Sequence, residues 1–318
     1  MTSPAHATVG VDIGGTKTLA ALVATDGTVL RRLRAHTPAG SGPGAVLDTA
    51  ARLAAELIPE AADRPVGVGT AGTVDPATGD IRYATDSLPG WTGTAVRAEL
   101  AGRLGRPVRV ANDVHAAALG ESWAGAGRGR GHLLLVAVGT GLGGALVRHG
   151  RIDPGARGAA GAVAHLPAPG AGRLRCGCGR YGHLEAVASG TGLAAGYALR
   201  TGERITGREV AERATAGDAA AREVVERAGA SLGAALAGLV TTLDPQVVLV
   251  AGGAGGALLP AATAAYAAEL PPGWAGVPLL PAALGTDAVV VGAARLATGD
   301  PAAASADPGR PAIEEGKD

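Results

Sequence analysis

The sequence predicts an α/β protein with two lobes around a cleft, and three observations lead to this fold class. Short apolar runs typical of buried strands alternate with longer runs of helical periodicity. A strand–glycine–threonine–strand unit occurs twice, around residues 9–23 and 133–148. The 318 residues are enough for two compact lobes, each with its own core. Two such units that face each other across a cleft could hold the two ends of a polyphosphate.

The elements of the first lobe, expected at residues 1–112, begin with a meander of three strands. Its predicted strands are 9–13, 19–23, 29–34, 66–69 and 108–111, and its predicted helices are 45–57 and 93–104.

The second lobe, expected at residues 113–286, is mostly helical after its strands. Its predicted strands are 133–138, 144–148 and 247–250, and its predicted helices are 114–125, one from Glu185, 219–243 and one from Leu258. Pro245 stops the long Ala-rich helix. A helix at 287–298 is expected to pack back on the first lobe. The Ala- and Pro-rich tail 299–318 has little to bury and is expected to be disordered.

Composition excludes several classes of function. The formal net charge is zero, which is not the electrostatic footprint of a nucleic-acid-binding protein. No apolar run approaches the roughly twenty residues that span a bilayer, and no charged segment followed by an apolar stretch opens the chain. We therefore expect a cytoplasmic protein without nucleic-acid or membrane partners. With no Phe and one Met, many small side chains must pack the core.

The first hairpin, Asp12-Ile13-Gly14-Gly15-Thr16-Lys17, is a candidate phosphate site. Glycines let successive backbone N–H groups converge on an anion, Thr16 and Thr18 add hydroxyl donors, and Asp12 can face a hydrated divalent cation. An ordinary two-residue turn between strands is the alternative for Gly14-Gly15. The same alternative applies to Gly139-Thr140-Gly141 after the strand at 133–138, and to Gly252-Gly253 after the strand at 247–250.

Asn112-Asp113 lies where a predicted strand ends and a helix begins, a usual place for a catalytic side chain in an open α/β lobe. An N-cap is the structural alternative, because Asn or Asp there accepts hydrogen bonds from free backbone N–H groups.

The residues His165, Cys176, Cys178 and His183 form the pattern His-x10-Cys-x-Cys-x4-His. These are four ligands of the kind that a closed tetrahedral Zn²⁺ site uses. Buried reduced thiols beside surface histidines are the alternative.

Taken together and in order, these motifs resemble those of the ROK family, the sugar kinases and related repressors of the actin-like ATPase (ribonuclease H-like) fold. The resemblance runs from about Val9 to Ala297. It is carried by Asp12-Ile13-Gly14-Gly15-Thr16-Lys17, Gly67-Val68-Gly69-Thr70-Ala71-Gly72-Thr73-Val74-Asp75, Pro89-Gly90-Trp91, Asn112-Asp113, Gly139-Thr140-Gly141, His165, Cys176-Gly177-Cys178-Gly179, Leu184-Glu185 and Gly252-Gly253.

The resemblance implies ATP-dependent phosphorylation of a hexose at its 6-hydroxyl, with ATP and Mg²⁺ as cofactors and a structural Zn²⁺. It implies that Asp113 is the general base and that the sugar contacts Gly72, Asn112, Asp113, His165 and Glu185. The implied nucleotide site comprises Asp12, Gly14, Gly15, Thr16, Lys17, Gly139, Thr140, Gly141, Gly252 and Gly253. Zinc would be held by His165, Cys176, Cys178 and His183, with the second ring nitrogen of His165 toward the sugar. Relatives also suggest a homodimer or higher homo-oligomer.

Two departures from the family pattern stand out. The family places a third Cys where this chain has His183, and an imidazole can replace a thiolate as a zinc ligand. Family kinases for glucose or N-acetylmannosamine usually carry a sugar-binding Glu where this chain has Ala162. Loss of that carboxylate removes a charge-assisted hydrogen bond worth roughly 1.5–3 kcal/mol. The pocket is therefore expected either to bind glucose weakly or to prefer an amino- or N-acyl-hexose.

Two other functions follow from the same family. A sugar-responsive repressor would need an N-terminal helix-turn-helix, and only Met1 to Ala7 precede the first predicted strand. A sugar sensor that binds without turnover is suggested by Ala162, although the base and the phosphate loops remain in place.

Overall fold

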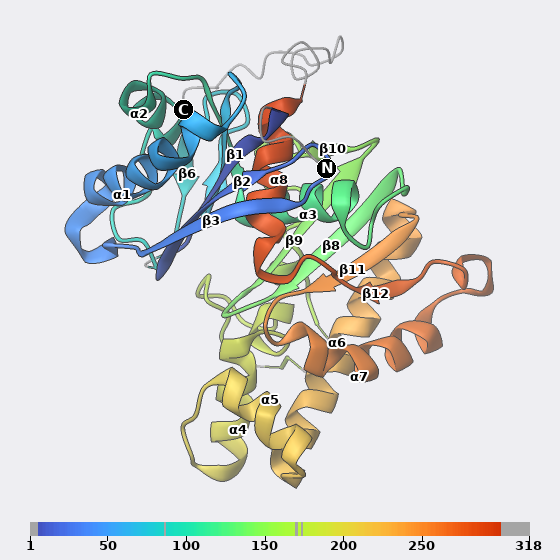
Figure 1. Cartoon of the computed structure of the whole chain (residues 1–318). Helices are drawn as coiled ribbons and strands as arrows, with labels where there is room; N and C mark the ends of the chain where they lie inside the picture. The colour runs from blue at the N-terminus through green and yellow to red at the C-terminus, as the bar shows by residue number, and fades with distance from the viewer. Residues whose placement is uncertain (1–5, 86, 169–170, 173, 300–318) are drawn as a thin grey trace, which may run out of the picture.

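The computed structural model describes residues 6–299 except 86, 169–170 and 173 (Figure 1). Apart from Gly299, the tail expected to be disordered lies outside the described residues.

The first sheet has the strand order β3-β2-β1-β4-β7. β1 (Thr8–Ile13), β2 (Lys17–Val23) and β3 (Val29–His36) form the predicted antiparallel meander, and β4 (Val66–Thr70) and β7 (Val108–Asn112) run parallel to β1. Ala20 and Leu22 face the core shared with α1 (Gly42–Leu57), whereas Leu19, Ala21 and Val23 pack against α8 (Ala288–Thr298). Because helices cover both faces, β2 is apolar from Leu19 to Val23 instead of alternating.

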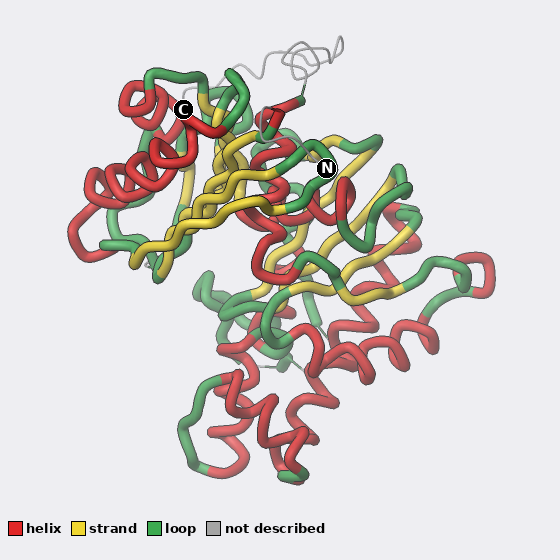
Figure 2. Tube along the Cα trace, viewed as in Figure 1, coloured by secondary structure: helices red, strands yellow, loops and turns green. Residues whose placement is uncertain are grey.

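The second sheet repeats this order as β10-β9-β8-β11-β12. β8 (His132–Val138), β9 (Leu142–Arg148) and β10 (Arg151–Asp153) are antiparallel, and β11 (Val247–Ala251) and β12 (Leu279–Pro281) run parallel to β8. The duplication seen in the sequence as two hairpins therefore extends to two whole sheets, each flanked by helices (Figure 2).

α3 (Asp113–Ala124) and α8 lie between the two sheets and cross each other at glycines (Figure 1). A Cβ on Gly292 would lie 1.6 Å from the carbonyl oxygen of Ala116, and one on Gly67 would lie 1.7 Å from that of Ala293. Backbones can approach this closely only where no side chain intervenes. This close packing accounts for how a chain without Phe fills its core.

The helical region beneath the second sheet contains α4 (Gly190–Thr201), α5 (Gly207–Ala216), α6 (Ala219–Leu243) and α7 (Gly255–Glu269). The helix predicted from Glu185 is wrong: residues Leu184–Ala186 form one 3-10 turn, and α4 begins after Ser189, whose hydroxyl accepts a hydrogen bond from the Gly192 N–H. α5 was not predicted, although Thr206 and Glu209 form the capping box that starts it.

The remaining elements are small. α2 spans Val96–Leu104, so the helix expected from Gly93 starts three residues later, and α7 starts at Gly255, before the expected Leu258. β5 (Thr73–Val74) and β6 (Ile81–Tyr83) form a separate hairpin that the sequence did not predict. Short 3-10 turns also occur at Ala39–Ser41, Ile58–Glu60, Val163–His165, Pro272–Trp274 and Gly285–Asp287.

One helix of the described chain, α6, is long and apolar enough to span a membrane by length and composition alone. Its apolar side packs against α7 and the second sheet, with 56% of the window buried inside the protein. Such burial is what the core helix of a globular protein requires.

Candidate active site

Asp12 and Asp113 come together at one end of the first sheet. Asp12 pairs with Gly69 across parallel strands and Thr70 pairs with Asn112, so the carboxyl ends of β1, β4 and β7 meet at the same edge. Side chains at these strand ends converge for the reason that makes this edge the usual ligand site in open α/β sheets.

Asn112 caps α3 as its structural alternative predicted, and its amide also holds Asp113; its contact with the sugar stays a prediction. Its Oδ1 accepts hydrogen bonds from the N–H groups of Val114 (2.9 Å) and His115 (3.2 Å), which caps α3. Its Nδ2 donates to the carbonyl oxygen of Gly72 (2.9 Å) and to Oδ1 of Asp113 (2.8 Å). The cap thus fixes an amide that ties Asp113 to the Gly72 loop.

The electrostatics of the two carboxyl groups favour protonation. Burial, together with the negative charge of Asp113, raises the pKa of Asp12 to about 7, against a smaller opposing effect of Lys17. Burial also raises the pKa of Asp113, although the hydrogen bonds from the Val114 N–H and from Asn112 oppose the rise. Two partly buried carboxyl groups at one edge of the sheet can bind a cation or act as proton acceptors themselves.

A cavity of about 160 Å³ opens beside this edge. It brings together three of the predicted sugar-site residues, Gly72, Asn112 and His165, together with Ala162. Gly72 has φ +98°, and a Cβ there would lie 2.7 Å from the carbonyl oxygen of Tyr83, so only glycine fits. Half of its lining consists of small residues: Gly143, Gly144, Gly158, Ala159, Ala160, Ala162 and Ala164.

His115 also lines this cavity, and the sequence reasoning missed it. Its Nε2 lies 3.1 Å from the carbonyl oxygen of Ala160, and burial lowers its pKa, which favours the neutral ring. The signal available in the sequence was its position two residues after Asp113, in the first turn of α3.

The first two glycine loops follow equivalent strands of the two sheets, β1 and β8. The Gly14 N–H donates to the carbonyl oxygen of Lys17 (3.1 Å), and the Gly139 N–H donates to that of Gly141 (3.0 Å). The side chains of Thr16, Lys17 and Thr140 are exposed.

The third loop lies against the second. Gly252 has φ +89°, and a Cβ there would lie 2.3 Å from the carbonyl oxygen of Val138, directly before Gly139. At Gly253, by contrast, a Cβ would meet no atom within 4 Å. The structure therefore brings the loops at 139–141 and 252–253 together, as a shared nucleotide site requires.

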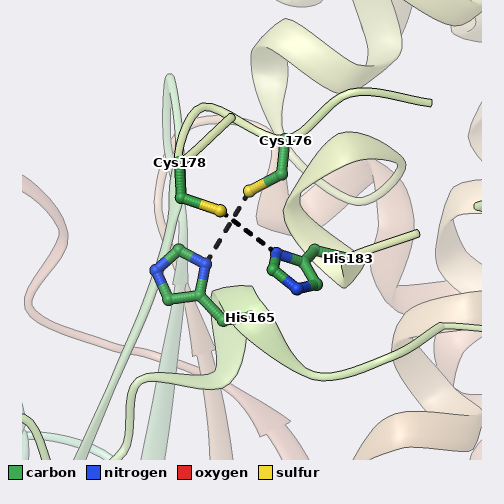
Figure 3. A group of neighbouring side chains, drawn as sticks. All are labelled: His165, Cys176, Cys178 and His183. Atoms are coloured by element: carbon green, nitrogen blue, oxygen red, sulfur yellow. Dashed lines mark hydrogen bonds between the residues drawn. The ribbon is translucent and has the colours of Figure 1, made fainter. Parts of the chain in front are cut away.

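The four predicted zinc ligands form one cluster (Figure 3). Their ligand atoms all lie within 4.8 Å of one another, although the residues span 165–183. Cys176 Sγ lies 3.7 Å from His165 Nδ1, and Cys178 Sγ lies 3.3 Å from His183 Nδ1. Ligand atoms of a tetrahedral Zn²⁺ site, with Zn–S of about 2.3 Å and Zn–N of about 2.0–2.1 Å, have similar separations. Nδ1 of His165 faces the cluster, while the residue also lines the cavity.

Glu185 is not among the residues that line this cavity. Its Oε2 accepts a hydrogen bond from the Leu142 N–H (3.1 Å), and its Oε1 accepts from the Gly177 N–H and the Cys176 thiol (both 3.3 Å). The carboxylate therefore joins the second glycine loop to the Cys/His cluster, and its predicted contact with the sugar stays a prediction.

Two five-stranded sheets of the same strand order, glycine loops after β1 and β8, and two carboxyl groups at the end of the first sheet are the features expected of the actin-like ATPase fold. The model of the ROK family matches residues 8–300. The chain is 32% identical over 263 residues to the glucokinase of Thermotoga maritima, covering 77% of this chain and 81% of that protein. It is also 32% identical over 254 residues to the N-acetyl-D-glucosamine kinase of Vibrio vulnificus, covering 77% and 83%.

A solved structure supports the same assignment. The chain is similar to a ROK family glucokinase from Streptomyces griseus in complex with glucose and AMPPNP, with a TM-score of 0.78 and 32% identity over 92% of this chain and 99% of that one. This protein belongs to the ROK family and has the actin-like ATPase fold.

Proposed function

We propose that this protein, an ATP-dependent sugar kinase, phosphorylates the 6-hydroxyl of a hexose with Asp113 as general base. The observation that carries the proposal is the chain of hydrogen bonds from the Gly72 carbonyl through Asn112 to Asp113, beside the cavity that Gly72, Asn112 and His165 line. Glucose and AMPPNP in the similar Streptomyces griseus structure support both substrates.

The reaction requires a base that aligns the hydroxyl and accepts its proton late in a loose transition state. Within the described part of the chain, the Asn112 amide and the Val114 N–H both donate to Oδ1 of Asp113, so Oδ2 is the oxygen available to accept the sugar proton. Burial, by raising the pKa of Asp113, makes it a better proton acceptor. Mg²⁺ held near Asp12 would neutralise the phosphates, and backbone N–H groups of the glycine loops would hold them.

The donor set of the cluster fits a structural Zn²⁺, which would be held by His165, Cys176, Cys178 and His183. Without a cation, burial, with smaller contributions from the Cys178 side chain and Glu185, raises the pKa of Cys176 to about 12, so a metal is needed to keep this thiol deprotonated. Four protein ligands leave no open position, so zinc would order the 165–185 segment and orient His165 toward the sugar.

An amino- or N-acyl-hexose is the second candidate substrate. Ala162 leaves the cavity wall without a carboxylate, and the neighbouring alanines leave room for a substituent on the ring. The similar Vibrio vulnificus kinase is named for N-acetyl-D-glucosamine, which favours keeping this alternative.

The remaining proposals concern organisation. We place the lobe boundary at residues 112/113, with α8 completing the first lobe because it packs on β1 and β4. The lobes would close on sugar and nucleotide to exclude water. A homo-oligomer in the cytoplasm is expected from the family.

The test is a coupled assay of the purified protein with ATP, Mg²⁺ and a panel of glucose, mannose, fructose and their amino and N-acetyl derivatives. Product at the 6-position from at least one sugar is expected. If the protein phosphorylates none of these sugars, the kinase assignment is refuted. Sugar binding without ATP binding, measured by calorimetry, would favour a sensor. Specific binding to operator DNA would favour a regulator.

A further inference from the structure

Glu121, near the end of α3, is completely buried although the proposed chemistry does not use it. Its Oε2 accepts hydrogen bonds from the N–H groups of Ala126 (2.9 Å) and Ala283 (3.1 Å), and its Oε1 accepts one from the Leu284 N–H (2.7 Å). A buried carboxylate is tolerated only where such charge-assisted bonds replace its hydration.

The three donors belong to the two segments that connect the sheets. Ala126 lies between α3 and β8, where the chain passes from the first sheet to the second. Ala283 and Leu284 lie between β12 and α8, where it returns. One carboxylate therefore ties the outgoing and the returning connection to the same helix, although the segments are about 160 residues apart.

The surrounding backbones are packed as a crossing point (Figure 1). A Cβ on Gly120 would lie 2.5 Å from the carbonyl oxygen of Ala288, so α3 and α8 touch backbone to backbone beside Glu121. A Cβ on Gly125 would lie 2.0 Å from Glu121 Oε2, so the carboxylate fills that space. Two helices that touch at glycines have few interdigitating side chains to rearrange when they rotate, which suits a hinge between rigid bodies.

We propose that Glu121 is a positioning residue that fastens the pivot about which the two lobes close on sugar and nucleotide. The inference rests on the proposed function, because closure matters only if the two substrates meet between the lobes. Glu121 acts through α3: Asp113 begins this helix, two turns before Glu121. A loosened pivot would leave Asp113 less well aligned in the closed state, and misalignment costs rate more than binding.

Glu121→Gln tests the proposal because the amide keeps the shape but places an NH2 group against backbone N–H donors. The matched control is Tyr197→Phe, which removes a hydroxyl that donates to Asp218 (2.9 Å) and accepts from Arg213 (3.0 Å) in the helical region. Hydrogen–deuterium exchange of the substrate-free protein is measured for peptides containing Ala126, Ala283 and Leu284. We expect exchange there to accelerate about tenfold or more in the Gln variant and to stay unchanged in the control.

The second readout is kinetic and excludes a merely structural role. Both variants are expected to unfold at lower temperature, but only Glu121→Gln should lower kcat, about tenfold or more, with KM for ATP within about twofold. Unchanged exchange at these peptides, or faster exchange with unchanged kcat, would overturn the proposal.

If the Gln variant does not fold, Glu121→Asp, which keeps the charge but retracts it, is expected to show a smaller loss of the same kind. Failure of the wild type to phosphorylate any sugar would instead refute the proposed function, while the exchange comparison would still decide the fastening role.

Discussion

Replacement of Asp113 by asparagine separates its chemical role from its structural one. Oδ1 of Asp113 accepts hydrogen bonds from Asn112 Nδ2 (2.8 Å) and the Val114 N–H (2.9 Å), and an asparagine oxygen can accept both. The substitution changes the other atom, which becomes a donor that cannot take the sugar proton. The helix start should therefore be preserved while the base is lost.

The expected loss follows from the size of general-base catalysis. We expect kcat to fall about 10²- to 10⁴-fold, which corresponds to about 2.7–5.4 kcal/mol of transition-state stabilisation. Stability should not fall with it. Because burial raises the pKa of Asp113, the ionised carboxylate is disfavoured in the folded protein, and a neutral amide removes that penalty. The unfolding temperature at pH 8 should equal or exceed that of the wild type.

The assay is steady-state phosphorylation of the best sugar of the panel, with thermal unfolding measured on the same samples. Asp48→Asn is the matched control, because this carboxylate is 71% exposed and pairs with Arg103 away from the cavity. It should leave kcat unchanged. Full turnover by the Asp113 variant would refute the base assignment, and loss of activity together with a marked drop in unfolding temperature would refute the claim that the helix start is preserved.

Four further predictions concern stability, metal and specificity. In metal-free buffer, the free energy of unfolding of Asp12→Asn should rise relative to that of the wild type between about pH 4 and 7 and then stay constant, because the folded pKa of Asp12, about 7, exceeds its unfolded value. Denaturant unfolding that gives the same difference between variant and wild type at pH 5 and pH 8 would contradict this. Metal analysis should find one Zn²⁺ per chain, and removal of the zinc by a chelator should lower the unfolding temperature. The Cys178→Ser variant should bind less zinc. If the metal-free protein keeps its activity and stability, the site is ruled out. Ala162→Glu should lower KM for glucose about 10- to 100-fold, equivalent to about 1.4–2.8 kcal/mol, and an unchanged KM would show that this wall does not contact the sugar. Gly292→Ala should lower the free energy of unfolding by about 3 kcal/mol, because its Cβ would collide with the Ala116 carbonyl. Gly238→Ala, on the exposed side of α6, should raise it by about 0.5–1 kcal/mol. Equal effects of the two substitutions would contradict the proposed packing.

Local patterns predicted the strands best. β1, β2, the β8–β9 hairpin and β11 were visible because both faces of these strands are mostly buried, which leaves short runs of apolar residues bounded by glycine. β3 differs, since partly buried and exposed residues alternate along it. The helix expected from Glu185 was wrong because its apolar residues serve a compact loop around the Cys/His cluster. α5 was missed although Thr206 and Glu209 carry a start signal, since the helix is short and mostly polar.

The candidate site divides in the same way. Asn112-Asp113, the glycine loops and the four Cys and His residues were predicted because each is a local pattern with a chemical reason. His115 and Glu121 were missed because a buried polar residue inside a helical run gives no sign of what it will face. Their partners, the Ala160 carbonyl and the Ala283 and Leu284 N–H groups, are 45, 162 and 163 residues away.

The sequence by itself determined which groups are available: loops that can approach phosphate, a capped carboxylate at a strand end and four soft metal ligands. Only the tertiary structure decided which of them meet. Parallel strand ends brought Asp12 to Asp113, close packing of α3 on α8 placed Glu121 across both connections, and Glu185 joined the second glycine loop to the cluster instead of lining the cavity. The reason is physical: hydrogen bonding and burial within a segment are read from neighbouring residues, whereas contacts between segments depend on how whole sheets and helices pack.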